Sequence, residues 1–202
     1  MRETRALHRL RRPVGMVVIG CSSGGLVALE QVLGPLPASF PAPIAIVQHI
    51  GPKGPGVAAS LERSVRLSVK EADEKEASEP GRIYLAPPDY HLLVEPNGSF
   101  SLSVDPRVNF CRPAIDVLFE SAVDGFGDRL IGVLLTGNNA DGAHGLLKIR
   151  QAGGMTLVED PETAAFPSMP RAAVALGAAE RVLSLGEIAQ ALQDEVVRHD
   201  GE

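Results

Sequence analysis

Apolar residues form unbroken runs at four places in the chain, without the polar alternation of a half-exposed strand. Such runs are typical of strands that are buried on both faces of a parallel sheet. Each run is followed by small or polar residues and then, sooner or later, by a helical pattern. The runs predict strands over residues 14–20 (VGMVVIG), 43–49 (PIAIVQH), 129–137 (RLIGVLLTG) and 154–160 (GMTLVED).

Apolar residues spaced three to four positions apart predict the helices. In one of them Pro113 is expected near the first turn, where a missing N–H is tolerated. The last helix is expected to begin at the capping pattern Ser184-x-x-Glu187. The predicted helices lie within residues 26–33, 112–123, 141–154 and 184–197.

A β-hairpin interrupts this alternation of strands and helices. The pair Asn97-Gly98 is flanked by apolar alternation on both sides, which is the strongest short-range hairpin signal. Strands that alternate with helices indicate a parallel sheet. The sequence therefore predicts an α/β fold with a doubly wound, mostly parallel sheet flanked by helices, and an inserted antiparallel β-hairpin.

Charge and composition limit the function classes. The net charge is −6, and residues 1–12 hold five Arg against one acid, so the remainder carries 14 − 24 = −10. An acidic body is not expected to bind nucleic acid, and no apolar run reaches the ~18 residues that span a bilayer. We expect a basic N-terminal tail over residues 1–13, a single folded domain over 14–195 and a C-terminal tail over 196–202.

Cysteine usage fits a reducing compartment. Cys21 and Cys111 are too few for a disulfide framework or a zinc site. We therefore expect a cytoplasmic protein, with no membrane insertion and no nucleic-acid partner. No cluster of ligand-type residues predicts a metal or a cofactor.

A hydroxyl, an imidazole and a carboxylate follow three of the predicted strands. The first strand ends at Ser22, the second at His49, and the third leads through a short loop to Asp141. Ligands of open α/β sheets bind beyond the carboxyl ends of the strands. A serine, a histidine and an acid at this edge are the groups that nucleophilic catalysis needs.

The turn after the first strand has several possible interpretations. Residues 20–24 match G-x-S-x-G, a strand–turn–helix elbow that exposes a serine hydroxyl next to unpaired helix N–H groups. A dinucleotide site fits poorly because Ser22 replaces the second glycine, and no G-K-[ST] follows for a P-loop. The triad order Ser, His, Asp also differs from that of α/β-hydrolases. A lipoprotein-type cleavage before Cys21 would remove a predicted core strand.

Each candidate residue also has a purely structural interpretation. Ser22 could be a turn residue, His49 a core histidine, and Asp141 the cap of the helix that follows it. Among the other histidines, His144 is the one that could face a substrate, from the first turn of that helix. The sequence alone leaves these alternatives open.

Six blocks of the sequence resemble one known family, the CheB-type chemotaxis protein-glutamate methylesterases. The resemblance covers roughly residues 14–192, and the blocks occur in the order and spacing of the family's catalytic domain. They are IGCSSGG, VQHI, GRIYLAPPDYHLLV, RPAIDVLF, LLTGNNADGAHGL and FPSMPRAAV.

The resemblance implies a reaction and a set of roles. The family hydrolyses γ-glutamyl methyl esters on methyl-accepting chemotaxis receptors, and many members deamidate receptor glutamines. By this resemblance Ser22 is the nucleophile, His49 the general base and Asp141 the orienting acid. The N–H group of Ser23 is the expected oxyanion donor, and Asn138 is expected beside the substrate.

This chain departs from the family pattern at the loop before the acid. The usual T-G-M-G-x-D becomes Thr136-Gly137-Asn138-Asn139-Ala140-Asp141, so the Met and the second Gly are replaced. The Met position helps to shape the oxyanion region in the family, and the amide of Asn138 could compensate for its loss. The alternative is a catalytically weak or inactive module that binds receptors or partners.

Family members often carry an N-terminal receiver domain. Only about 13 residues precede the first predicted strand here. We therefore expect no regulation by an attached receiver, and a separate response-regulator protein is a candidate partner besides the receptors.

Overall fold

The computed structural model describes residues 13–49 and 56–197. His8 and His199 lie outside these ranges, and so do most residues of the two predicted terminal tails. Strands are β1 Met16–Cys21, β2 Ile44–Gln48, β3 Ser68–Glu71, β4 Arg82–Leu85, β5 His91–Val94, β6 Phe100–Ser103, β7 Leu130–Leu134, β8 Met155–Glu159 and β9 Arg181–Leu183. Helices are α1 Gly25–Leu33, α2 Val57–Glu62, α3 Ile115–Phe126, the 3-10 helix η1 Gly127–Arg129, α4 Ala143–Gln151, α5 Ser168–Ala175 and α6 Leu185–Val197.

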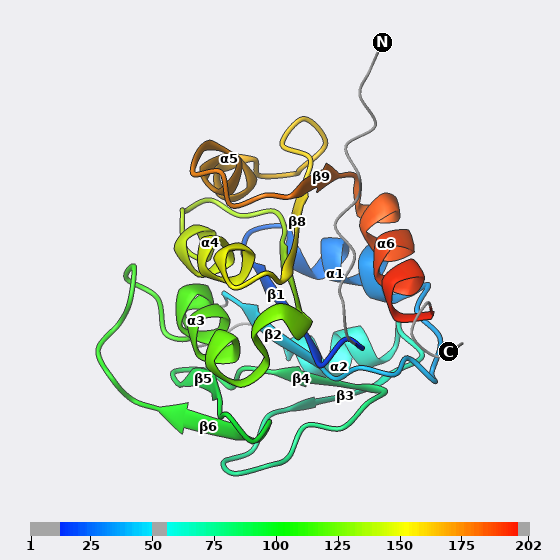
Figure 1. The fold of residues 1–202 in the computed structure, drawn as a ribbon, viewed down its shortest axis with the longest axis vertical. Helices are drawn as coiled ribbons and strands as arrows, with labels where there is room; N and C mark the ends of the chain where they lie inside the picture. Colours follow the sequence, from blue (N-terminus) through cyan, green and yellow to red (C-terminus); the bar gives the residue numbers. More distant parts are fainter. Residues whose placement is uncertain (1–12, 50–55, 198–202) are drawn as a thin grey trace.

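A seven-stranded sheet forms the centre of the molecule (Figure 1), in the order β3-β4-β2-β1-β7-β8-β9. Every strand pair in it is parallel. Strand β1 pairs with β2 on one side and with β7 on the other. The strand order therefore changes direction at β1. Such sheets bind ligands at this point, beyond the carboxyl ends of β1 and β7.

Helices cover both faces of the sheet and form two separate cores. Helices α1, α2 and α6 pack on one face, with Leu29, Leu33 and Leu192 in that core. Helices α3, α4 and α5 pack on the other face, where Ile115, Phe119 and other apolar residues form the second core. Strands buried on both faces explain why their sequences are apolar without alternation.

The sequence predictions for the strands and for the fold class are confirmed. The four apolar runs correspond to β1, β2, β7 and β8. The Asn97-Gly98 turn joins β5 and β6 as an antiparallel pair that packs beside α3. No helix of the described residues is long and apolar enough to cross a bilayer.

The starts of helices α3 and α6 can be compared with their predictions. Helix α3 begins at Ile115, so Pro113 lies near its first turn, as predicted, but two residues before it: Ala114 is still extended, with φ −110° and ψ 138°. The capping pattern at the last helix is confirmed, since Glu187 accepts hydrogen bonds from the N–H and hydroxyl of Ser184 at 2.8 and 2.6 Å. That helix continues to Val197, so the predicted domain end at residue 195 falls inside α6.

Candidate active site

Ser22 occupies a tight turn between β1 and α1. Its N–H donates to the carbonyl of Thr136 at 2.9 Å, and its own carbonyl accepts the N–H of Gly25 at 2.9 Å. Gly24 completes the turn with a left-handed φ of 78°, which favours glycine. The hydroxyl of Ser22 therefore lies on a turn that a main-chain hydrogen bond joins to the segment directly after β7.

The side chain of Gln48 connects this turn to the end of β2. Its Nε2 donates to the carbonyls of Ser22 at 2.8 Å and His49 at 3.2 Å, and its Oε1 accepts the thiol of Cys21 at 2.8 Å. A Cβ on Gly25 would lie 2.1 Å from that Oε1, so only glycine leaves room for the connection. Gln48 thus positions the serine turn relative to the histidine.

Ser22 and His49 are close neighbours at the sheet edge. The N–H of His49 donates to the carbonyl of Cys21 at 3.0 Å, and both residues line one pocket of about 230 Å³. Across the described ranges, 13–49 and 56–197, no hydrogen bond joins the Ser22 hydroxyl to the His49 ring. Catalytic hydrogen bonds are often long in a free enzyme and tighten when substrate binds.

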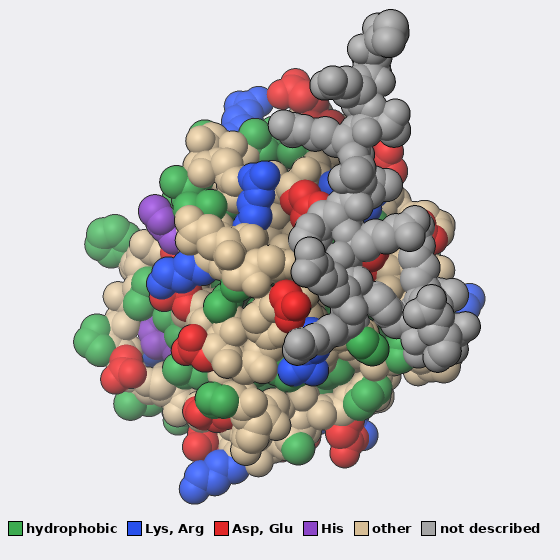
Figure 2. Space-filling view, viewed as in Figure 1, with side chains coloured by type: hydrophobic (Ala, Val, Ile, Leu, Met, Phe, Trp, Pro, Cys, Tyr) green, Lys and Arg blue, Asp and Glu red, His purple; other side chains and the backbone are tan. Residues whose placement is uncertain are grey.

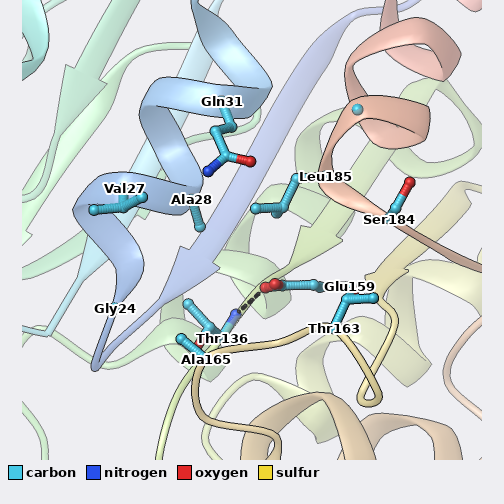
Figure 3. A pocket seen from close by; sticks show the side chains of 11 residues that line it. Gly24, Val27, Ala28, Gln31, Thr136, Glu159, Thr163, Ala165, Ser184 and Leu185 are labelled. Atoms are coloured by element: carbon cyan, nitrogen blue, oxygen red, sulfur yellow. Dashed lines mark hydrogen bonds between the residues drawn. The ribbon is translucent and has the colours of Figure 1, made fainter.

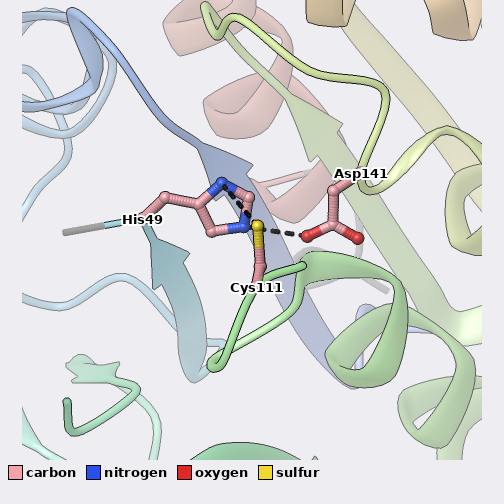
Figure 4. A group of neighbouring side chains, drawn as sticks. All are labelled: His49, Cys111 and Asp141. Carbon is pink, nitrogen blue, oxygen red and sulfur yellow. Dashed lines mark hydrogen bonds and ion pairs between the residues drawn. The ribbon is translucent and has the colours of Figure 1, made fainter. Parts of the chain in front are cut away.

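His49 and Asp141 form a hydrogen-bonded pair (Figure 4). The distance from Nε2 to the Oδ2 atom of Asp141 is 2.8 Å, and the Asp141 side chain is fully buried. A carboxylate on one ring nitrogen fixes the tautomer and leaves the other nitrogen, Nδ1, to act as a base. Nδ1 lies 3.4 Å from the amide of Asn139 and 3.9 Å from the sulfur of Cys111.

The carboxylate of Asp141 also caps helix α3. Oδ2 accepts the N–H of Ile115 at 2.6 Å, and Oδ1 accepts the N–H of Asp116 at 3.2 Å and the amide of Asn109 at 2.9 Å. Burial raises the pKa of Asp141, but the hydrogen bonds from His49, Asn109 and Ile115 outweigh it and lower the pKa overall. The acid is therefore ionised when it faces the imidazole.

A second buried acid, Asp116, forms a hydrogen bond that links helix α3 to helix α4. Asp116, in the first turn of α3, accepts the N–H of Gly145 in α4 at 2.7 Å, while Asp141, which directly precedes α4, caps α3. Asn109 donates to both carboxylates, at 2.8 Å to Asp116. Burial raises the pKa of Asp116, and the charge of Asp141 adds to this rise.

The same cluster holds the residues best placed for a metal ion. Among the described residues, the ligand atoms of His49, Cys111 and Asp141 lie within 4.8 Å of one another. Burial raises the pKa of Cys111, so its sulfur is a neutral thiol rather than the thiolate that metals prefer. Asp141 already accepts two hydrogen bonds on each oxygen. His49, Cys111 and Asp141 thus fit a hydrogen-bonded cluster better than a metal centre.

A larger pocket of about 410 Å³ borders the serine turn at Gly24 (Figure 3). Glu159 lies buried in its wall and accepts the N–H of Thr136 at 2.7 Å. Thr136 in turn donates through its hydroxyl to the carbonyl of Ser23 at 3.0 Å. Burial raises the pKa of Glu159, and the bond from Thr136 partly offsets this.

The structure brings the three predicted groups to one edge of the sheet. Ser23 lies next to Ser22 in the turn, and Asn138 is exposed on the loop before Asp141. Their roles at an oxyanion stay predictions. Sequence reasoning missed Gln48, Asn109 and Asn139, whose amides contact the candidate triad.

The two other histidines that the structure describes, His91 and His144, lie in different environments. His91 is buried, where its Nδ1 accepts the N–H of Ala114 and its Nε2 donates to the carbonyl of Pro106, both at 3.2 Å. It is a satisfied core histidine. His144 lies exposed in the first turn of α4.

Comparison with known proteins supplies the family. Residues 17–192 match the family model described as CheB methylesterase. A Leptospira interrogans protein, provisionally named protein-glutamate methylesterase/protein-glutamine glutaminase, is 50% identical over 86% of this chain and 91% of its own length. The protein-glutamate methylesterase FrzG of Myxococcus xanthus is 44% identical over 89% of this chain, which spans 54% of that protein. The crystal structure of the Thermotoga maritima CheB methylesterase catalytic domain superposes with a TM-score of 0.86 at 37% identity, covering 89% of this chain and 97% of that one.

Proposed function

Because the chain belongs to the CheB methylesterase family, we propose that it is a serine hydrolase which removes methyl esters from glutamate side chains of methyl-accepting chemotaxis receptors. The proposal includes deamidation of receptor glutamines, because relatives carry both activities in their names. Its place of action is the cytoplasm, which fits the two free cysteines, Cys21 and Cys111.

The observation that carries the proposal is the 2.8 Å hydrogen bond between His49 and Asp141 beside the Ser22 turn. It joins residues 92 positions apart in sequence, at the sheet edge where ligands bind. A histidine that was merely a core residue would not need a buried, ionised carboxylate on one nitrogen and an open pocket beside it.

In the proposed reaction, Ser22 Oγ attacks the ester carbonyl and His49 Nδ1 takes the hydroxyl proton. The tetrahedral oxyanion forms near the N–H of Ser23, with Asn138 available to donate from its loop. The C–O bond then breaks, and methanol leaves with the proton from His49. Water, deprotonated by His49, attacks the acyl-enzyme and releases the free glutamate and Ser22.

A second candidate is a receptor-binding module with weak or no catalysis, with a separate response-regulator protein as a further partner. It is favoured by the absence, among the described residues, of a hydrogen bond between the Ser22 hydroxyl and His49. Asn138 and Asn139 also replace the usual loop residues.

A serine-directed fluorophosphonate separates the two candidates. We expect covalent labelling that is lost in Ser22→Ala, together with Ser22-dependent release of methanol from methylated receptor fragments and of ammonia from their glutamine forms. A protein that binds receptor but shows neither labelling nor methanol release would be the binding module.

A further inference from the structure

The loop between β6 and α3 ends in a tight turn next to the candidate triad. Val108 and Cys111 exchange both of their main-chain hydrogen bonds, at 3.1 and 2.8 Å. The two residues between them, Asn109 and Phe110, have φ values of 51° and 64°. Positive φ at both central positions is the mark of a type I′ turn, for which Asn-Gly is the preferred pair.

Phe110 therefore stands where glycine is preferred, and its side chain is 96% exposed. A bulky residue in the left-handed region is strained, and a fully exposed aromatic ring contributes little to a core. Neither folding nor packing explains this residue. Strain of this kind collects at functional sites.

The loop that carries Phe110 is held firmly in place. The guanidinium of Arg112 donates to the carbonyls of Val104 and Asp105 at 2.7 and 3.1 Å, which joins the two limbs of the loop. The buried ring of His91 holds the carbonyl of Pro106 at 3.2 Å. The backbone that carries the Phe110 ring is therefore preorganised, so binding through this loop costs little backbone ordering entropy.

Both neighbours of Phe110 contact the candidate triad. Asn109 donates to Asp141 at 2.9 Å, and the sulfur of Cys111 lies 3.9 Å from Nδ1 of His49. The aromatic ring thus projects into solvent from the rim of the active site. On the same loop Val104 is 66% exposed and Val108 is 37% exposed. Hydrophobic side chains project from this side of the molecule in Figure 2.

We propose that Phe110 is the docking anchor for the substrate protein, and that its ring inserts among apolar side chains beside the methylated glutamate of the receptor. This inference rests on the proposed function, since it names the surface by which that site grips a folded protein. Buried aromatic anchors surrounded by weaker apolar contacts are the usual hot spots of protein interfaces. Val104 and Val108 supply the weaker contacts.

The test compares a protein substrate with a small reagent. In Phe110→Ala and Phe110→Gly we expect kcat/KM for the methylated cytoplasmic fragment of a receptor to fall about tenfold or more, mainly through KM. The rate of Ser22 labelling by the fluorophosphonate should stay within about twofold, because that reagent needs no docking surface. Phe110→Tyr should retain activity on the receptor.

Stability measurements exclude a structural explanation. Phe110→Gly should melt at the same temperature as the wild type or higher, because glycine relieves the strain of the turn. The control is Val182→Ala on the edge strand β9, which removes an exposed apolar side chain (43% exposed) far from this loop and should leave receptor turnover unchanged.

Binding of the receptor fragments to Ser22→Ala and to the double variant with Phe110→Ala tests docking without turnover. Weaker binding of the double variant supports the inference even if the protein proves to be no esterase. Unchanged binding and turnover in the Phe110 variants would overturn it. A parallel fall in Ser22 labelling, or no binding of any fragment to Ser22→Ala, would overturn it as well.

Discussion

Asp141 has more partners than the orientation of a histidine requires. Its two oxygens accept one bond from His49, one from Asn109 and two from the first N–H groups of α3. The sequence leaves open that Asp141 merely caps the helix that follows it, α4. The structure shows a cap of a different helix, α3, by the same carboxylate that bonds to His49.

Asp141→Asn is therefore expected to weaken both catalysis and stability. We expect kcat for methanol release to fall about 10⁴-fold, because an amide favours the wrong tautomer of His49. The free energy of unfolding should fall by about 1–3 kcal/mol, because one buried N–H loses its acceptor. Steady-state rates and urea unfolding measure the two effects. Ser22→Ala is the control, which should lose activity without loss of stability.

A second prediction for a single residue concerns Gln48. Gln48→Leu removes the side-chain bonds to the carbonyls of Ser22 and His49, so the nucleophile and the base lose their common anchor. A displacement of about 1 Å can cost roughly 10²-fold in rate, so we expect a fall of about that size in kcat with little change in KM. Gln190→Leu on the exposed face of α6 is the matched control. A change confined to KM would contradict a positioning role.

Ser22 and His49 could be predicted from the strand pattern, whereas Asn109, which a loop brings to the site, could not. Ser22 and His49 directly follow apolar strands, so the parallel sheet brings them together whatever the loops do. Asn109 contacts Asp141 only because a type I′ turn aims its side chain inward, and the sequence VNFC gives no such signal. Gln48 was visible in the sequence, but its orientation depends on the space beside Gly25.

At the scale of elements, α3 and α4 depend on each other for their first turns. Each helix satisfies N–H groups of the other through a buried acid, Asp141 for α3 and Asp116 for α4. No side chain at the N-cap of either helix does so. The start of α3 could not be predicted for this reason, since its cap comes from 26 residues away. The strands were predictable because burial on both faces leaves a continuous apolar signal, whereas the three-residue β9 is too short to show one.

The raised pKa of Asp116 predicts how stability depends on pH. An acid with a raised pKa in the folded protein favours folding most below its unfolded value of about 3.9, and this contribution is lost as pH rises through the folded value. The stability of the wild type relative to Asp116→Asn should therefore improve as pH falls from 7 toward about 4.

Urea unfolding of both proteins across this range measures the difference. The lowered pKa of Asp141 acts in the opposite sense, since its contribution is lost only as pH falls below about 3.9, outside the range of the test. A constant difference, or one that moves toward the variant at low pH, would contradict the prediction.

In the whole molecule, the sheet separates the residues that hold Asp141 from one of the two cores. Asp141, Asp116 and Asn109 lie on the side of α3 and α4, whereas α6 packs on α1 across the opposite face (Figure 1). Leu192 of α6 and Leu118 of α3 are both fully buried, one in each core. Substitutions of these two leucines are therefore matched in burial, but only Leu118 lies on a helix that is bonded to Asp141.

Leu192→Ala and Leu118→Ala should each lower the free energy of unfolding by about 2–5 kcal/mol, the usual cost of a cavity left by leucine. Well below the melting temperature, Leu192→Ala should keep the kcat of the wild type, because no residue that holds Asp141 lies on α6. Leu118→Ala should reduce kcat as well, because it loosens the helix whose first N–H groups fix the carboxylate. Calorimetry and methanol release at one low temperature compare them, and equal losses of kcat would mean that the two cores support the site alike.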